Sequence, residues 1–152
     1  MTAIVTHSIP AWRAESDFLI RVDLADAGLP ETMEQIWARK IGHLTFEVCC
    51  IPFFAYGLAL GDTVQCNCEL VMQKRLASGG HNTLRVVIAD FASENQIHEA
   101  IHGWVLATGL LHEWYSPGYL AIDLPPAVQG KLDTSPLDDL CRRNLIEIEF
   151  AT

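Results

Sequence analysis

The first half of the chain alternates apolar and polar residues with the two-residue period of β-strands. Apolar side chains stand at every second position from Phe18 to Leu24, which predicts one strand. Further strands are predicted over residues 34–41, 44–51, 63–68, 69–77 and 83–88. Gly42 and His43 fit a two-residue turn, so the strands that flank them should pair as a hairpin. We therefore predict an antiparallel β-meander that curls into a small open barrel.

The second half changes to the 3.6-residue period of helices. Ser93 and Gln96 match a capping box, which marks the start of a helix. One face of this helix comprises Ile97, Ile101, Trp104, Val105 and Thr108. Strands are predicted over residues 111–115, 119–124 and 145–150, and a second helix begins at Ser135-Pro136. From Thr83 onward the order is β-α-β-β-α-β, which is typical of a ferredoxin-like unit.

These patterns predict an α+β fold made of three segments. Residues 1–16 form a flexible lead-in, residues 17–82 a β-meander lobe, and residues 83–152 a ferredoxin-like lobe. We expect the two lobes to form one compact unit, because 152 residues is a one-domain length.

The composition is that of a globular protein, with 50% apolar and 19% charged residues. A net charge of −9 with only ten scattered Lys and Arg residues argues against a nucleic-acid partner and suits a basic protein partner. No apolar run approaches the roughly 20 residues of a membrane helix, and the first residues lack the pattern of a secretory signal. Five cysteines are an odd number, which disfavours a disulfide framework. We predict a cytoplasmic protein that does not enter a membrane.

Several short motifs follow one another along the chain, each of them once. They are Trp37, Ile51-Pro52-Phe53-Phe54, Gly57, Gly61-Asp62 with Val64, Gly80 with Thr83-Leu84-Arg85-Val86, Leu110, and Ala121-Ile122-Asp123-Leu124-Pro125. Their order and spacing resemble a bacterial family of small uncharacterised proteins, the domain of unknown function 4265. That family often has Asn before its apolar-Pro-Phe triplet, where this chain has Cys50. The resemblance implies a fold and a bacterial source, and it implies no substrate, cofactor or catalytic residue.

The segment from His98 to His102 matches the H-E-x-x-H zinc motif. On a helix the two histidines lie one turn apart and can chelate zinc, while Glu99 can activate a bound water. A catalytic zinc also needs a third protein ligand, and His112 and Glu113 are the nearest downstream candidates. The structural alternative places both histidines on the part-exposed flank of a helix whose apolar face packs on a sheet.

The cysteine pairs do not have the C-x₂₋₄-C spacing of zinc sites. Cys49 is adjacent to Cys50, and one residue separates Cys66 from Cys68. Buried cysteine behaves as a small apolar residue, so we predict that both pairs pack in the core.

A second group of candidate site residues surrounds the turns of the first lobe. The candidates for binding a ligand or partner are Phe54, Tyr56, Asp62, His81 and Arg85. The aromatic residues either close the end of the barrel or line a binding surface. Asp62 is expected to cap its turn. Arg85 is expected to point outward and to pair with an acidic residue such as Glu47 or Glu69.

Three hypotheses about function follow. The first is a non-enzymatic binding or regulatory module without a cofactor, which binds a protein partner or a small ligand. One version is an immunity-like protein that binds a basic partner. A homodimer is also possible under this hypothesis. The second is a zinc-dependent hydrolase with His98 and His102 as ligands and Glu99 as general base. The third is a small-molecule binder with its pocket between the lobes, near Tyr56, His81 and Trp104.

Overall fold

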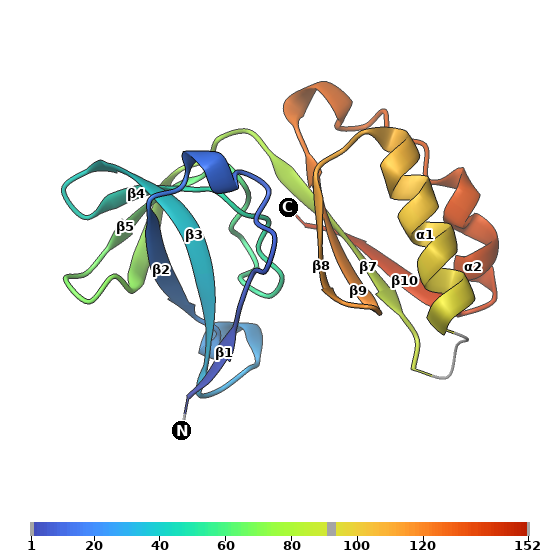
Figure 1. Ribbon diagram of the computed structural model, residues 1–152, viewed down its shortest axis with the longest axis horizontal. Helices are drawn as coiled ribbons and strands as arrows, with labels where there is room; N and C mark the ends of the chain where they lie inside the picture. Colours follow the sequence, from blue (N-terminus) through green and yellow to red (C-terminus); the bar gives the residue numbers. More distant parts are fainter. Residues whose placement is uncertain (1, 91–93, 152) are drawn as a thin grey trace.

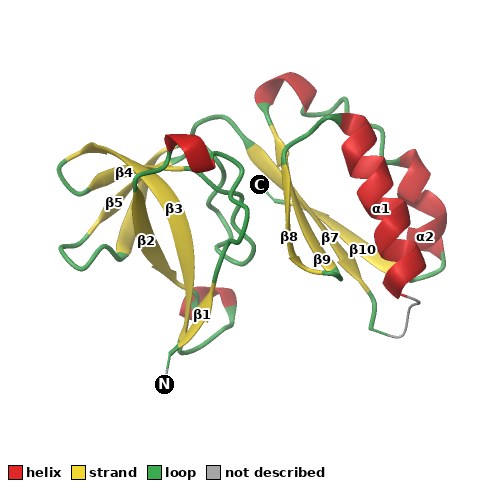
Figure 2. Cartoon of the chain, in the orientation of Figure 1, coloured by secondary structure: helices red, strands yellow, loops and turns green. Residues whose placement is uncertain are grey.

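The computed structural model describes residues 2–90 and 94–151, which fold into two lobes that lie side by side (Figure 1). The N-terminal lobe consists mainly of strands and loops, and the C-terminal lobe carries two helices on one face of a sheet (Figure 2). The fold is therefore mixed α+β with two sheets, as predicted. The predicted capping box at Ser93 lies outside the described residues. Among the described residues, the helices are too short or too polar to cross a bilayer.

The N-terminal lobe is one strongly curled sheet. Its strands are β1 (Ala3–Val5), β2 (Phe18–Asp23), β3 (Thr32–Gly42), β4 (Thr45–Val48), β5 (Thr63–Cys66) and β6 (Met72–Ala77), with short 3₁₀ turns at Arg13–Glu15 and Ala25–Ala27. The strand order is β1-β3-β4-β5-β6, and β2 pairs with β3. An isolated bridge joins Arg21 of β2 to Val71, directly before β6. The two ends of the sheet therefore meet and enclose an apolar core.

The N-terminal segment, which we predicted to be a flexible lead-in, is tied to the rest of the lobe. Strand β1 pairs in parallel with the start of β3. His7 is buried, and the backbone N–H of Trp12 donates to the carbonyl of Cys49 over 2.9 Å. This segment lacks strand periodicity because only three of its residues pair as a strand.

The C-terminal lobe packs helices on an antiparallel sheet. Its elements are β7 (Asn82–Ile88), α1 (Glu94–Thr108), β8 (His112–Ser116), β9 (Tyr119–Leu124), α2 (Asp138–Arg142) and β10 (Ile146–Phe150), with 3₁₀ turns at Pro126–Val128 and Ser135–Leu137. The strand order is β10-β7-β9-β8. Ile97, Ile101 and Val105 of α1 are buried in one core with alternate residues of β7 and β9. The predicted apolar face of the first helix is thus confirmed at these three positions.

Both faces of this sheet carry buried side chains, which overturns one prediction. Leu84 and Val86 of β7 face the helices, while Thr83 and Arg85 face the N-terminal lobe and are 1% and 2% exposed. The prediction that Arg85 points outward is therefore wrong, and Glu47 pairs with Arg39 instead. An alternating strand shows which residues share a face, but it does not show that a second lobe covers the polar face.

The turn at Gly61-Asp62 touches the loop at Gly79-Gly80. The Asp62 carboxylate is fully buried and accepts the backbone N–H groups of Ala59 (2.9 Å) and Gly79 (3.0 Å). A Cβ on Gly79 would lie 2.4 Å from the carbonyl oxygen of Gly61, so only glycine fits there. The prediction that Asp62 caps its turn is confirmed.

The cysteines follow the predicted core packing with one exception. Cys49, Cys50 and Cys66 are buried, whereas Cys68 is exposed. Strand β5 ends at Cys66, and the backbone N–H of Leu70 donates to the carbonyl of Asn67 in the turn that follows. Cys68 therefore leaves the face that it would share with Cys66 in a continuous strand.

Candidate functional site

A buried group of charged side chains joins the two lobes. His7 donates from Nε2 to Glu34 of β3 over 2.6 Å and from Nδ1 to Glu113 of β8 over 2.7 Å. A carboxylate only accepts hydrogen bonds, so both ring nitrogens carry a proton and the ring is an imidazolium. Burial alone would lower the pKa of His7, but the Cys50 thiol and the Glu113 and Glu34 carboxylates beside the ring raise the pKa to about 12. One cation thus lies between two carboxylates, with almost no contact to solvent.

The same carboxylates hold the loop of residues 51–55, which contains the Ile51-Pro52-Phe53-Phe54 motif. Its N–H groups donate as follows: Ile51 to Glu113 (2.6 Å), and Phe53, Phe54 and Ala55 to Glu34 (2.7, 2.8 and 2.9 Å). Pro52 has no N–H group and stands at the one position of this loop where no acceptor is provided. A buried loop must satisfy its backbone polar groups, and here two carboxylates from different lobes satisfy all of its donors.

Two carbonyl groups of this loop, those of Pro52 and Phe53, are bound from the C-terminal lobe. Arg85 donates from Nε to the Phe53 carbonyl (2.9 Å) and from Nη2 to the Pro52 carbonyl (3.0 Å). The hydroxyl of Tyr119 also donates to the Phe53 carbonyl. The Phe53 ring stacks on His7 with centroids 4.2 Å apart and an interplanar angle of 3°. The loop therefore joins the two lobes, and we call it with its partners the inter-lobe joint. The residues of the Ile51-Pro52-Phe53-Phe54 motif make these contacts.

Cys50 and His7 contain the residue types of a nucleophile–base pair, but their geometry does not activate the thiol. Cys50 is fully buried. Burial raises the pKa of its thiol to about 11, although nearby His7 acts in the opposite direction. Both nitrogens of His7 are already bound to carboxylates, so the ring has no lone pair with which to take a proton from sulfur. The group is built to hold the lobes together.

The sequence did not indicate that His7, Glu34 and Glu113 are partners. Glu34 did carry a signal, because it shares the buried face of β3 with Ile36 and Ala38. His7 and Glu113 are 106 positions apart in the chain, and no local pattern connects them.

The predicted zinc motif has a geometry of its own. The rings of His98 and His102 lie on one flank of α1 with centroids 5.9 Å apart. Trp114 donates from Nε1 to Nδ1 of His102 over 3.1 Å, and an indole N–H can only donate. In this arrangement the indole N–H of Trp114 occupies the Nδ1 lone pair of His102.

The other parts of a zinc site are also dispersed. His98 uses Nδ1 to donate to the carbonyl of Pro117 over 2.9 Å, and Glu99 is exposed. Within the described parts of the chain, no set of three His, Cys, Asp or Glu side chains is arranged to hold a metal ion. The zinc hypothesis stays a prediction, with no ligand set assembled around His98 and His102.

The five predicted binding residues fall into two groups. Phe54, Tyr56 and Arg85 meet at the inter-lobe joint, where the Arg85 guanidinium lies 4.8 Å from the centre of the Tyr56 ring. Asp62 and His81 lie elsewhere: Asp62 caps its turn, and His81 binds Asp123 with Nδ1 over 2.8 Å. The aromatic loop therefore packs against the other lobe.

The predicted pocket near Tyr56, His81 and Trp104 is not formed by these residues together. His81 lines a small hollow of about 30 Å³ beside Thr83, which has room for about one water molecule. Trp104 lines a different and larger cavity, within the C-terminal lobe. Tyr56 is half exposed at the joint.

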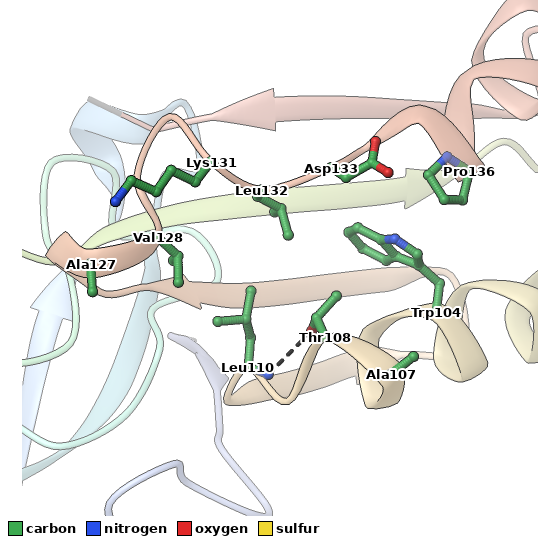
Figure 3. Close-up of a pocket in the computed structure, with 10 residues that line it drawn as sticks. All are labelled: Trp104, Ala107, Thr108, Leu110, Ala127, Val128, Lys131, Leu132, Asp133 and Pro136. Carbon is green, nitrogen blue, oxygen red and sulfur yellow. Dashed lines mark hydrogen bonds between the residues drawn. The ribbon is translucent and has the colours of Figure 1, made fainter.

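The larger cavity lies beside the C-terminal half of α1 (Figure 3) and has a volume of about 370 Å³. It is lined by Trp104, Ala107, Thr108, Leu110, Ala127, Val128, Lys131, Leu132, Asp133 and Pro136. Two features of the chain form it. Gly109 ends the helix with φ of 74°, and Pro125-Pro126 directs the segment after β9 out of the sheet and past the end of α1.

The walls of this cavity are mostly apolar. The Trp104 indole and the side chains of Leu110, Val128 and Leu132 face the space between α1 and the segment that covers it (Figure 3). The hydroxyl of Thr108 donates to the carbonyl of Val105 and accepts the N–H of Leu110, so its proton is not available to a ligand. The charged side chains of the lining are exposed and stand at its rim. The arrangement suits a small molecule with an apolar body.

Comparison with known proteins agrees with the sequence motifs. A family model described as "Domain of unknown function (DUF4265)" matches residues 34–143, and the chain belongs to this family. Among curated proteins, none matches the chain. One similar solved structure is titled "Novel crystal structure of a hypothetical protein from Neisseria gonorrhoeae"; it is 21% identical with a TM-score of 0.57, over 78% of this chain and 82% of that one. This likeness shows the fold alone.

Proposed function

We propose that this member of the DUF4265 family is a non-enzymatic binding protein that holds a small, mainly apolar molecule in the cavity beside α1. The observation that carries the proposal is the cavity itself. Its volume of about 370 Å³ lies within the range of roughly 300–1,000 Å³ that ligand sites occupy. An indole ring and aliphatic side chains supply the apolar contact area that such sites use.

The rim of the cavity carries one cation, Lys131, and one carboxylate, Asp133. The Asp133 carboxyl is bound by Ser135, whose hydroxyl and, to a smaller extent, backbone N–H (2.9 Å) lower the pKa of Asp133. Lys131 makes no ion pair with any side chain that the structure describes, so its charge is available. A compact molecule with an apolar body and one carboxylate, sulfonate or phosphate group matches this arrangement.

The state of the reactive side chains supports a role without catalysis. The histidine and carboxylates of the inter-lobe group bind one another and the loop of residues 51–55. The Cys50 thiol is buried beside an imidazolium that cannot act as a base. A catalytic set needs groups that face a substrate and that still have a lone pair or proton available for the reaction.

Two finer assignments belong with this proposal. We assign the C-terminal lobe to the ferredoxin-like class, and the alternation β7-α1-β8-β9-α2-β10 with strand order β10-β7-β9-β8 supports it. We also place the protein in the cytoplasm, and its five free cysteines are consistent with a reducing compartment.

The proposal is tested by filling the cavity. Ala107 lines the cavity on an exposed stretch of α1, and its neighbour Leu106 is 59% exposed and does not line it. We would titrate the wild type, Ala107→Trp and Leu106→Trp with anilinonaphthalene sulfonate, an apolar probe with one sulfonate group, and follow its fluorescence. We expect the affinity to fall at least about tenfold in Ala107→Trp and to change little in Leu106→Trp, since tenfold corresponds to about 1.4 kcal/mol of lost contact.

Cooperative urea unfolding of each variant serves as the control, because molten states also bind this probe. Equal affinities for the two tryptophan variants in folded protein would show that the probe binds elsewhere, and the proposed function would then be wrong.

A further inference from the structure

The sheet of the C-terminal lobe has one face on the helices and another turned toward the N-terminal lobe (Figure 1). The N-terminal lobe covers only part of this second face. Thr83, Arg85 and Asp123 are buried there, whereas Val87 of β7 is 37% exposed and Tyr115 of β8 is 45% exposed. The covered and the open part are thus successive segments of the same strands.

The open part forms a continuous strip across all four strands. Val87 pairs with Tyr119 of β9 on one side and with Glu147 of β10 on the other. The Tyr115 and Tyr119 rings lie 5.8 Å apart. Antiparallel partners project from the same face of a sheet, so tyrosine, valine and glutamate follow one another from β8 to β10. We call these four residues the open strip.

The strip continues into the joint at one end and into a groove at the other. The Phe54 ring packs 5.0 Å from both tyrosines. At the β10 end, a groove of about 460 Å³ is lined by Val87, Asp90 and Glu147, among others. The strip therefore has aromatic residues at one end and a groove with carboxylates at the other.

The charge of this surface is negative and uncompensated. Glu147 and Glu149 project from the same face of β10 and are exposed, as is Asp90. None of these three carboxylates forms an ion pair within residues 2–90 and 94–151. Arg85, opposite Glu149 in the ladder, is occupied by the loop carbonyls. The whole chain adds to this field with a net charge of −9.

We propose that the open strip and its acidic end bind a basic, extended segment of a partner protein. Apolar or aromatic side chains of that segment pack on Tyr115 and Val87, and its Lys or Arg side chains reach Glu147, Glu149 and Asp90. Aromatic anchors beside opposite charges are typical of protein interfaces, and the charges direct the choice of partner.

Two other occupants fit the surface less well. A second copy of this chain in a two-fold contact would bring the same carboxylates together without compensating cations. A nucleic acid would meet carboxylates in place of the Lys and Arg that phosphates require. The inference is independent of the small-molecule cavity, which lies beside α1 on the other face of the sheet.

The test uses a defined probe. A fluorescent nine-residue peptide that alternates lysine with valine and tyrosine is titrated against the full chain, and a peptide with glutamate in place of lysine serves as the reference. We compare the wild type, the double variant Glu147→Lys/Glu149→Lys, and Tyr115→Ala. The control Glu99→Lys/Asp138→Lys makes the same change in charge on the two helices.

We expect the basic peptide to bind the wild type and the helix control alike, and to bind the Glu147→Lys/Glu149→Lys and Tyr115→Ala variants at least about tenfold more weakly, as for an interface with aromatic anchors and paired charges. Equal weakening by the helix control would show binding to net charge alone and would overturn the proposal. It would also be overturned if the basic peptide binds no better than the acidic one, or if sizing shows a dimer that only the Glu147→Lys/Glu149→Lys variant loses.

Discussion

Replacement of His7 by leucine is the most informative perturbation of the inter-lobe joint. Leucine fills a similar space but cannot donate to Glu34 or Glu113, which then lie buried without their shared cation. The Glu34 carboxylate keeps three backbone donors from the loop. The variant therefore loses two interactions: the positive charge between the two carboxylates, and the stacking of the His7 ring on Phe53.

The expected loss of stability is large compared with the total. Removing one partner from a buried ion pair costs about 3–5 kcal/mol, and loss of an aromatic stack costs about 0.5–1.5 kcal/mol more. Since the retained backbone donors offset part of this, we expect the free energy of unfolding to fall by about 3–5 kcal/mol at pH 7. A domain has about 5–15 kcal/mol in all, so the variant should be folded but close to its limit.

Urea denaturation followed by tryptophan fluorescence and by circular dichroism measures this loss. His43 lies exposed in the turn between β3 and β4, so His43→Leu makes the same chemical change outside the joint and should cost less than about 0.5 kcal/mol. A loss below about 1 kcal/mol in His7→Leu would refute the reasoning. It would mean that the joint is not held by the imidazolium.

Three further predictions follow from the structure. The His7 pKa rises from 6.5 to about 12 on folding, so the stabilisation that His7 provides is complete below pH 6.5 and is lost as the pH approaches 12. Between pH 7 and 9, the free energy of unfolding of the wild type should fall by up to about 1.4 kcal/mol per pH unit relative to His7→Leu. Parallel pH profiles of the two proteins in urea titrations would contradict this. Gly79→Ala should destabilise the protein by about 1–3 kcal/mol, because the added Cβ meets the Gly61 carbonyl. Gly103→Ala should stabilise the protein by up to about 1 kcal/mol, because Gly103 lies in α1 with open space around it. Thermal melts that reverse this order would be inconsistent with the turn contact. Elemental analysis of purified protein should find zinc well below one ion per chain, and stoichiometric zinc that is lost in His98→Ala would favour the zinc-hydrolase hypothesis instead.

Local patterns predicted the elements that obey a single period. The alternation from Phe18 to Leu24 became β2, and the spacing of Ile97, Ile101 and Val105 became the buried face of α1. Strand ends were less predictable. The strand expected to reach Ile51 ends at Val48, because the chain there turns into the loop whose donors are taken by side chains instead of a neighbouring strand.

The joint could not be predicted for a physical reason. Its bonds link residues 19 to 106 positions apart, and each partner alone reads as an ordinary surface residue. Glu34 is the informative exception, since a carboxylate on the buried face of a strand requires buried donors. The prediction for Arg85 was wrong for the opposite reason. Its side chain is polar and yet buried, because it binds the carbonyl groups of Phe53 and Pro52, and a polar strand position does not by itself mean an exposed one.

The cavity also escaped prediction, because it forms where a segment without regular structure crosses the end of a helix. Trp104 was expected in the core, and its ring does contact that core. That the ring also borders an open space depends on the course of residues 125–136, which Pro125-Pro126 directs in a way that local periodicity does not reveal.

The central claim, a ligand site beside α1, is tested most directly by methyl-resolved NMR. The methyl signals of Leu110, Val128 and Leu132, which line the cavity, are followed while anilinonaphthalene sulfonate is added to the full chain, with the methyls of Val48 and Val64 in the other lobe as the reference. We predict saturable shifts of the three cavity residues and none at the reference residues, and in Ala107→Trp we predict that the same shifts need at least about tenfold more probe. Shifts confined to residues outside the cavity, or equal shifts in both proteins, would contradict the claim.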